Sequence, residues 1–136
     1  MADERLFDLE VISPERVFYK GRVEFVELVT SEGEIGVYKN HIPMTSVLIP
    51  GIITIHEEGK VKNAAIHSGF VVILKDKMKV MAEVAEWPDE IDESRANEAK
   101  SRAEKRLKEG GPNIDTARAE AALKRSMARL GLKNIK

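Results

Sequence analysis

Two segments in the last third of this chain carry arginine at matching positions. Residues 91–107 (IDESRANEAKSRAEKRL) align with residues 114–130 (IDTARAEAALKRSMARL) at a shift of 23 positions. The recurring residues are Ile91, Asp92, Arg95, Ala96, Ala99, Arg102, Arg106 and Leu107, and Ile114, Asp115, Arg118, Ala119, Ala122, Arg125, Arg129 and Leu130. Because an α-helix turns by about 100° per residue, arginines at i, i+7 and i+11 share one face. Guanidinium is shaped for two-point contact with phosphate, so a bound anion is one candidate partner for such a face.

The residues between the two copies predict that they fold back on each other. Residues 108–113 read KEGGPN, which ends a helix and starts a turn. A stripe of small residues beside the arginines would let two helices approach closely, and it comprises Ala96, Ala99, Ala103, Ala119, Ala122 and Ser126. We therefore expect the arginines to line the seam of a hairpin, where carboxylates or a bound anion must balance their charge. The alternative is a solvated basic face with ordinary pairs such as Glu98 with Arg102.

The first two thirds of the chain predict a β-structure that positions this hairpin. Residues 5–87 contain short β-branched and apolar runs separated by polar turns. All seven aromatic residues lie before residue 88, so the main core belongs to this part. The predicted class is α+β, mainly β, with a β-sandwich or flattened barrel over residues 1–88 and an antiparallel two-helix hairpin over residues 89–136.

Capping residues suggest where the two helices begin and end. Asp89 or Asp92 would start a helix over roughly 90–109, and Asn113 or Asp115 would start one over roughly 114–130. Gly131 would end the second helix.

Composition restricts the function classes. Residues 1–90 hold 10 Lys+Arg and 16 Asp+Glu, a net of −6, whereas residues 91–136 hold 12 and 7, a net of +5. The chain has no cysteine, which excludes disulfides and thiolate chemistry. It has no apolar run near 18 residues and an acidic N-terminus, so we expect a soluble intracellular protein whose membrane association is indirect.

A search for catalytic motifs is negative. The chain has no GxxxxGK[ST], no GxGxxG after a strand, no HExxH and no cysteine-based zinc site. His41, His56 and His67 are far apart, and the interpretation for each is a surface or hydrogen-bonded histidine. Glu83 and Glu86 lack a nucleophile nearby. The basic helices carry no aromatic residues for base stacking, which argues against nucleic acid as a partner.

These residues together resemble one family. The chain is similar to the epsilon subunits of bacterial F-type ATP synthases over essentially its whole length. The resemblance rests on Gly33-Glu34-Ile35-Gly36, His41-Ile42-Pro43 and His67-Ser68-Gly69-Phe70, and on Ile91-Asp92-Glu93-Ser94-Arg95-Ala96, which matches the family's ATP-binding signature I/L-D-x-x-R-A.

The resemblance implies a non-catalytic rotor subunit of the central stalk. Such a subunit binds the gamma subunit, rests on the c-ring and is peripheral on the cytoplasmic face of the bacterial membrane. Its hairpin, folded down against the sandwich, permits ATP hydrolysis by the complex. When the hairpin extends toward the alpha and beta subunits, it inhibits this hydrolysis. In several members ATP binds the folded-down hairpin and is not hydrolysed. Mg²⁺ can accompany the ATP, and no metal is held by the protein alone.

The resemblance also implies roles for single residues. The ATP-binding positions are Glu86, Ile91, Asp92, Arg95, Ala96, Arg102, Arg118, Arg125 and Arg129, and the positions facing gamma and the c-ring are Glu34 and His41. Glu86 would face adenine, Ile91 the base or sugar, and Arg118 with Arg125 or Arg129 the phosphates. Asp92 would order Arg95 and the helix start. Arg106 shares their face without matching a motif.

Two departures from the family pattern stand out. His67-Ser68-Gly69 replaces Ser-Gly-Gly, and Lys39-Asn40 replaces Pro-Gly. Both are expected on the gamma and c-ring side, where Asn40 can adopt the left-handed conformation of glycine. Three alternatives stay open: a structural coupling subunit whose hairpin inhibits without binding nucleotide, an independent small-molecule enzyme, and a nucleic-acid-binding module.

Overall fold

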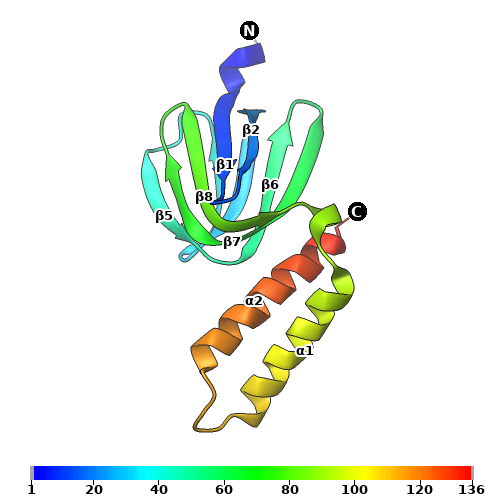
Figure 1. Ribbon diagram of the computed structural model, residues 1–136. Coiled ribbons are helices and arrows are strands. Elements are labelled where there is room, and N and C mark those ends of the chain that lie inside the picture. The colour runs from blue at the N-terminus through cyan, green and yellow to red at the C-terminus, as the bar shows by residue number, and fades with distance from the viewer. Residues whose placement is uncertain (1, 136) are drawn as a thin grey trace.

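The computed structural model describes residues 2–135 as a β-structure followed by two helices (Figure 1). The strands are β1 (Phe7–Ile12), β2 (Val17–Val23), β3 (Phe25–Thr30), β4 (Gly33–Tyr38), β5 (Met44–Leu48), β6 (Gly51–Glu57), β7 (Lys60–Ile73) and β8 (Lys77–Glu86). The helical elements are the 3-10 turns η1 (Ala2–Arg5) and η2 (Pro88–Glu90), and the helices α1 (Glu93–Glu109) and α2 (Thr116–Lys133). The predicted order of a β-region followed by a hairpin is confirmed.

The strands form one strongly curved sheet. Its order is β2-β1-β8-β7-β5-β3-β4, and β6 pairs with both β3 and β7. β1 and β8 run parallel, while the other paired strands are antiparallel. Because β6 bridges two strands that are apart in this order, the sheet folds over itself into the predicted flattened barrel.

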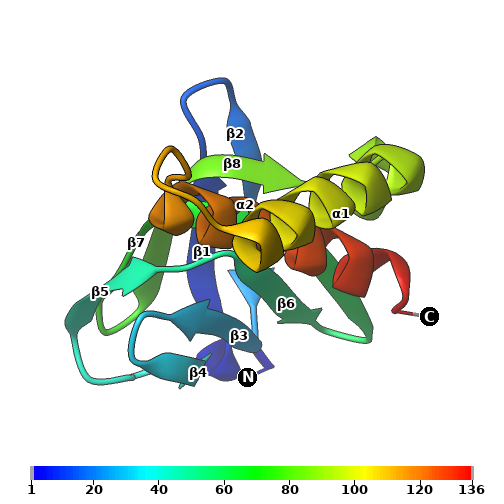
Figure 2. The ribbon, with the colours of Figure 1, turned by 90° about the horizontal axis from the view of Figure 1, so that it is seen from below.

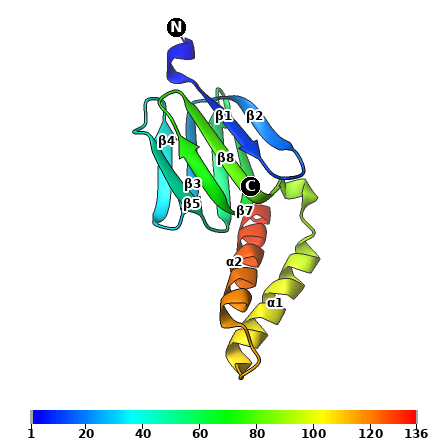
Figure 3. The ribbon, with the colours of Figure 1, turned by 60° about the vertical axis from the view of Figure 1, so that its left-hand side comes forward.

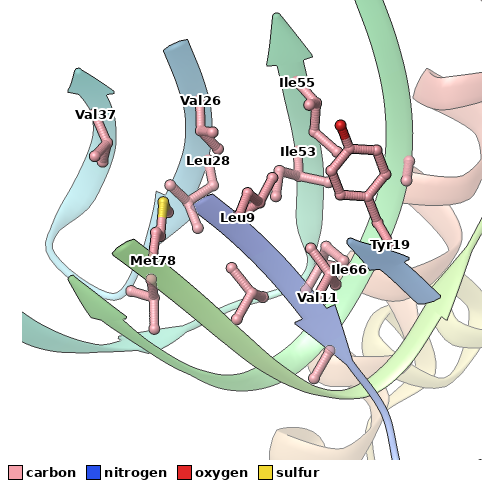
Figure 4. Close-up of a cluster of buried hydrophobic side chains, with 14 of the residues drawn as sticks. Leu9, Val11, Tyr19, Val26, Leu28, Val37, Ile53, Ile55, Ile66 and Met78 are labelled. Carbon is pink, nitrogen blue, oxygen red and sulfur yellow. The ribbon is translucent and has the colours of Figure 1, made fainter. Parts of the chain in front are cut away.

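The sandwich has its own hydrophobic core. The main buried cluster runs from Phe7 to Ala85 and includes Leu9, Ile53 and Met78, each at most 2% exposed (Figure 4). No described residue of α1 or α2 belongs to it. Asn40, in the loop after β4, has φ 67°, which confirms the left-handed backbone expected there.

The two helices begin alike because the repeat includes the capping residue. The Asp92 carboxylate accepts a hydrogen bond from the Arg95 amide at 3.1 Å, and that of Asp115 accepts one from the Arg118 amide at 3.0 Å. α1 starts at Glu93 rather than near residue 90 because η2 occupies Pro88–Glu90.

The prediction that Gly131 ends α2 was wrong. α2 continues to Lys133, and a Cβ at Gly131 would lie 3.5 Å from Ile52 Cδ1. That distance is an ordinary van der Waals contact, so the approach of α2 to β6 does not require glycine. The next residue, Leu132, is buried at 1% exposure and holds this end of α2 on the sandwich. This packing outweighs the intrinsic cost of about 1 kcal/mol for glycine inside a helix.

α2 is the helix that packs on the sandwich. It contacts β6, β7 and η2, and a second apolar cluster forms there from Ala65, Ile91 and Leu132 with Ile52 at its edge (Figure 2). The turn between the helices points away from the sandwich (Figure 3). Within residues 2–135, neither helix is long and apolar enough to cross a membrane.

Deletion of residues 91–136 should leave a folded sandwich. The main core ends at Ala85, so the truncation removes none of its members, and it uncovers the contact patch of Ile52 and Ala65 together with the Glu86 carboxylate. We expect a β-type circular dichroism spectrum and a cooperative thermal transition within a few degrees of that of the full chain. Loss of the cooperative transition would show that the sandwich and hairpin share one core.

Candidate functional site

The seam of the hairpin is filled by small side chains. The buried ones are Ala96, Ala103, Ala119 and Ser126, each at most 3% exposed. The Ser126 hydroxyl donates to the Ala122 carbonyl oxygen at 2.9 Å, so its polar group is satisfied inside the seam. The repeated arginines lie outside this contact, because residues one position away point about 100° aside. The arginines therefore flank the small residues of the seam, and the role expected for them there stays a prediction.

A cavity of about 540 Å³ lies where the base of the hairpin meets the end of β8. Its lining includes Glu90, Glu98 and Ala99 together with seven predicted ligand residues, which are Glu86, Ile91, Asp92, Arg95, Ala96, Arg102 and Arg129. The volume falls in the usual range for small-molecule sites. The fold thus brings together residues from β8, the linker, α1 and the last turns of α2.

Glu86 is the electrostatic centre of this cavity. Its Oε1 accepts hydrogen bonds from His67 Nε2 and Arg129 Nε, each at 2.8 Å. Burial alone would raise the pKa of Glu86, but these two hydrogen bonds and the charge of Arg129 lower it to about 2. The carboxylate therefore stays ionised at neutral pH and attaches α2 to β8.

Sequence reasoning missed the part that His67 plays here. His67 is 2% exposed in β7 and contacts Glu86. This departure from the family pattern was expected on the gamma and c-ring side, but His67 lies next to the candidate site. His67 Nδ1 is buried without a hydrogen-bond partner in the described structure. In the sequence, the only signal for this role was the histidine in place of serine. The antiparallel pairing of Ala65 with Glu86 brings His67, two residues further along β7, close to Glu86.

Two guanidinium groups in the cavity have no ion-pair partner. The carboxylates of Glu86 and Glu90 pair with Arg129 and Arg16, and that of Asp92 accepts the Arg95 amide. By contrast, the guanidinium groups of Arg95 and Arg102 have no ion pair in the part of the chain that the structure describes. The exposed Glu98 is the only further carboxylate in the lining.

Four predicted residues lie away from the cavity. Arg125 precedes Arg129 by one turn on the same face, about 6 Å along the helix axis, whereas Arg118 lies about 16 Å away along that axis. Neither lines the cavity. Glu34 is exposed in β4, and the His41 ring contacts the Ile42 carbonyl oxygen at 2.7 Å in the following loop. Within the described residues, no group of three His, Cys, Asp or Glu side chains could hold a metal.

Two family models together match almost all of the chain. The ATP synthase delta/epsilon chain β-sandwich domain matches residues 6–88. The ATP synthase delta/epsilon chain long α-helix domain matches residues 89–133. The boundary between them coincides with the predicted division after residue 88.

Curated relatives are similar over nearly the whole length. The ATP synthase epsilon chain of Caldanaerobacter subterraneus is 41% identical over 128 residues, which cover 93% of each chain. That of Caldicellulosiruptor bescii is 44% identical over 126 residues, covering 93% of this chain and 92% of the relative. That of Shouchella clausii is 43% identical over 122 residues and covers 90% of each.

A solved structure shares the fold. A chain of the mitochondrial ATP synthase of Euglena gracilis superposes with a TM-score of 0.82 at 22% identity, covering 91% of this chain and 79% of that one. At this identity the likeness concerns the fold alone.

Acid should weaken the fold through Glu86. Its pKa of about 2 in the folded state lies below the value of about 4.3 for an unperturbed glutamate, so its stabilisation is present above about pH 4.5 and lost as the pH falls toward 2. The shift corresponds to a contribution on the order of 3 kcal/mol. We expect Glu86→Gln to lower the free energy of urea unfolding by this order at pH 7, and the difference from wild type to shrink toward pH 2.

The exposed Glu83 of the same strand supplies the control. Glu83→Gln should leave the pH dependence unchanged. An effect of Glu86→Gln that is equal at pH 7 and pH 2.5 would mean that ionisation of Glu86 does not stabilise this site.

Proposed function

The chain belongs to the ATP synthase delta/epsilon family, and on that premise we propose that it is a non-catalytic epsilon subunit whose C-terminal hairpin binds ATP as a regulatory ligand. The observation that carries the proposal is the cavity in which Arg95, Arg102 and Arg129 converge beside Glu86. Two of these three guanidinium groups lack a carboxylate partner among the described residues. These two groups would be free to bind the phosphates of an anionic ligand.

The lining supports a division of roles within the proposed ATP site. Arg95 and Arg102 would bind the phosphates, because neither is held in an ion pair among the described residues. Ile91 is buried beside the cavity and offers an apolar surface to the base or sugar. Glu86 would accept a hydrogen bond from the adenine side. Since the described residues include no group of side chains that could hold a metal, Mg²⁺ would enter only with the nucleotide.

The outlying arginines have weaker support as ligands. Arg125, one turn beyond Arg129, would meet a triphosphate that extends along the hairpin toward its tip. Arg118 lies two further turns away, and we propose for it a contact only with the far end of such a ligand.

Binding of this kind would regulate by stabilising the docked hairpin. The contact with the sandwich buries few apolar residues, chiefly Ile91 and Leu132, so docking is easily biased. A ligand that binds only the docked form stabilises it by about 2.7 kcal/mol at a hundredfold excess over its Kd. We propose that the docked hairpin permits ATP hydrolysis by the complex, and that the released basic helices reach the alpha and beta subunits and inhibit it.

The sandwich offers a surface for the gamma subunit. Cross-strand pairs place a row of apolar side chains on one face, in the order Val17, Ile12, Met81, Phe70 and Val47 across β2, β1, β8, β7 and β5. Val17, Phe70 and Val47 are 60%, 49% and 58% exposed. A contiguous exposed apolar row is typical of an interaction surface.

The other proposed contacts place the chain in its complex. Glu34 and His41 would face gamma and the c-ring. The chain would thereby be peripheral on the cytoplasmic face of the bacterial membrane, held there by its partners.

A second candidate function has its own observation. The Arg129–Glu86 ion pair and the Leu132 cluster attach the hairpin without any ligand. A structural coupling subunit, whose hairpin inhibits but does not bind nucleotide, would need only these contacts. The two candidates differ in whether Arg95 and Arg102 receive a phosphate.

Titration calorimetry with ATP and ADP, each with and without Mg²⁺, separates the two candidates. We expect saturable 1:1 binding of ATP to the full chain, tighter than that of ADP. Arg102→Ala should weaken ATP binding by about 1–3 kcal/mol, as for the loss of a hydrogen bond to a charged group. Asp92→Ala combined with Arg95→Ala should abolish it.

Arg106→Ala is the matched control, because Arg106 lies one turn beyond Arg102 on α1 and does not line the cavity. It should bind ATP as the wild type does. Absence of binding up to millimolar ATP would support the coupling subunit instead, and equal losses in Arg102→Ala and Arg106→Ala would remove the cavity as the site.

The apolar row predicts a loss of gamma binding in Phe70→Glu. A charge within the row should lower affinity for purified gamma at least tenfold, or about 1.4 kcal/mol. The protein should stay folded, because the Phe70 side chain is half exposed. Val61→Glu, on the same strand and 53% exposed, should bind normally. Surface plasmon resonance would measure both, and wild-type affinity in Phe70→Glu would rule out this face.

A further inference from the structure

The turn between the sandwich and the hairpin is fastened to the sandwich at both of its ends. Trp87, just before η2, stacks on Phe18 with ring centroids 4.2 Å apart and packs against the main core. At the end of η2, Arg16 Nη2 donates to both carboxylate oxygens of Glu90, at 2.7 and 2.8 Å. Residues 87–90 therefore belong mechanically to the sandwich, although they follow its last strand.

Several contacts converge on the Arg16–Glu90 pair. An isolated exposed ion pair stabilises little. Here the Arg16 guanidinium also lies over the Phe18 ring, 5.0 Å from its centroid, and Glu90 Oε1 accepts the Trp87 amide at 2.9 Å. The hydrogen bond from Arg16, followed by that from the Trp87 backbone, lowers the pKa of Glu90. The pair thus closes the turn on itself and holds it to the loop between β1 and β2.

The backbone hydrogen bonds of the turn end at Ile91, and those of α1 begin at Asp92. The Ile91 amide donates back to the Pro88 carbonyl at 3.2 Å and so belongs to the turn. The Asp92 carbonyl and carboxylate accept the Ala96 and Arg95 amides, so Asp92 belongs to α1. Ile91 has ψ 126° and Asp92 has φ −86°, both in the broad extended region. No backbone hydrogen bond in the described chain crosses from residues 87–91 to α1.

The contacts that dock the hairpin do not include the Arg16–Glu90 pair. They are the Arg129–Glu86 ion pair, the bond from Lys133 Nζ to the Pro88 carbonyl oxygen at 3.0 Å, and the packing of Leu132 against Ala65 and Ile91. All of them can break while the Arg16–Glu90 pair stays intact.

We propose that Arg16 sets the pivot of the hairpin. With Glu90 held by Arg16, the hairpin leaves the sandwich as a unit by rotation between Ile91 and Asp92, and residues 87–90 stay in place. The proposal rests on the hairpin movement of the proposed function, and it is independent of whether ATP is bound.

Paired spin labels test the pivot in the full chain, because the protein has no native cysteine. Thr45→Cys on β5 is combined with Asp89→Cys to follow the turn, or with Ser101→Cys to follow α1; all three positions are exposed. The hairpin is released by Arg129→Ala with Leu132→Asp, which removes the ion pair and the buried leucine. We expect the 45–101 distances to shift and broaden on release, while the 45–89 distances remain as in the docked protein.

Adding Arg16→Ala to the released protein should broaden the 45–89 distances as well. Arg22→Ala is the control, since Arg22 pairs with Asp8 on the same β1–β2 hairpin but not with the turn. Broadening of 45–89 with Arg16 intact would place the pivot before Glu90 and overturn the proposal. Unchanged 45–101 distances after release would overturn it too, since Ile91–Asp92 would then not rotate. Neither result bears on ATP affinity, which calorimetry measures separately.

Discussion

One carboxylate, that of Glu86, determines where the hairpin lies. It ends β8 and is shared at 2.8 Å by His67 of β7 and Arg129 of α2. Removing one partner from such a partly buried pair leaves the other charge uncompensated, which costs more than the pair itself contributes. The position of α2 therefore depends on this contact, and the place of α1, the cavity and the buried Ile91 follow from the position of α2.

The hairpin is built to hold together internally more firmly than it holds to the sandwich. Small residues let α1 and α2 pack along their length, and each helix has its own aspartate cap. Against the sandwich, α2 contributes mainly Leu132 and the charged ends of Arg129 and Lys133. A unit with a continuous seam and a small contact patch separates at the patch first.

Periodicity and capping predicted the fold well, because those signals are local. The strand region, the hairpin and the caps Asp92 and Asp115 all follow from nearest-neighbour chemistry. The continuation of α2 through Gly131 could not be predicted, since it depends on the burial of Leu132 against Ala65 and Ile91 of other elements. The same holds for His67: nothing in its own neighbourhood marks it, and only the pairing of β7 with β8 brings it to Glu86. Seven of the nine positions that the family resemblance implies as ligands line one cavity, whereas Arg118 and Arg125 lie nearer the turn of the hairpin and do not line it.

The charges around the cavity make the effect of an anion depend on which arginine it meets. A phosphate that binds Arg95 and Arg102 adds contacts without breaking any, because neither has a carboxylate partner among the described residues. A phosphate that takes Arg129 must first separate it from Glu86, and so it competes with the contact that docks α2. Stabilisation of the docked hairpin therefore requires that the α1 arginines carry most of the binding, with Arg129 remaining on Glu86. In this arrangement the arginines of α1 and the Glu86 carboxylate of β8 lie on opposite sides of one cavity, and both favour the docked hairpin.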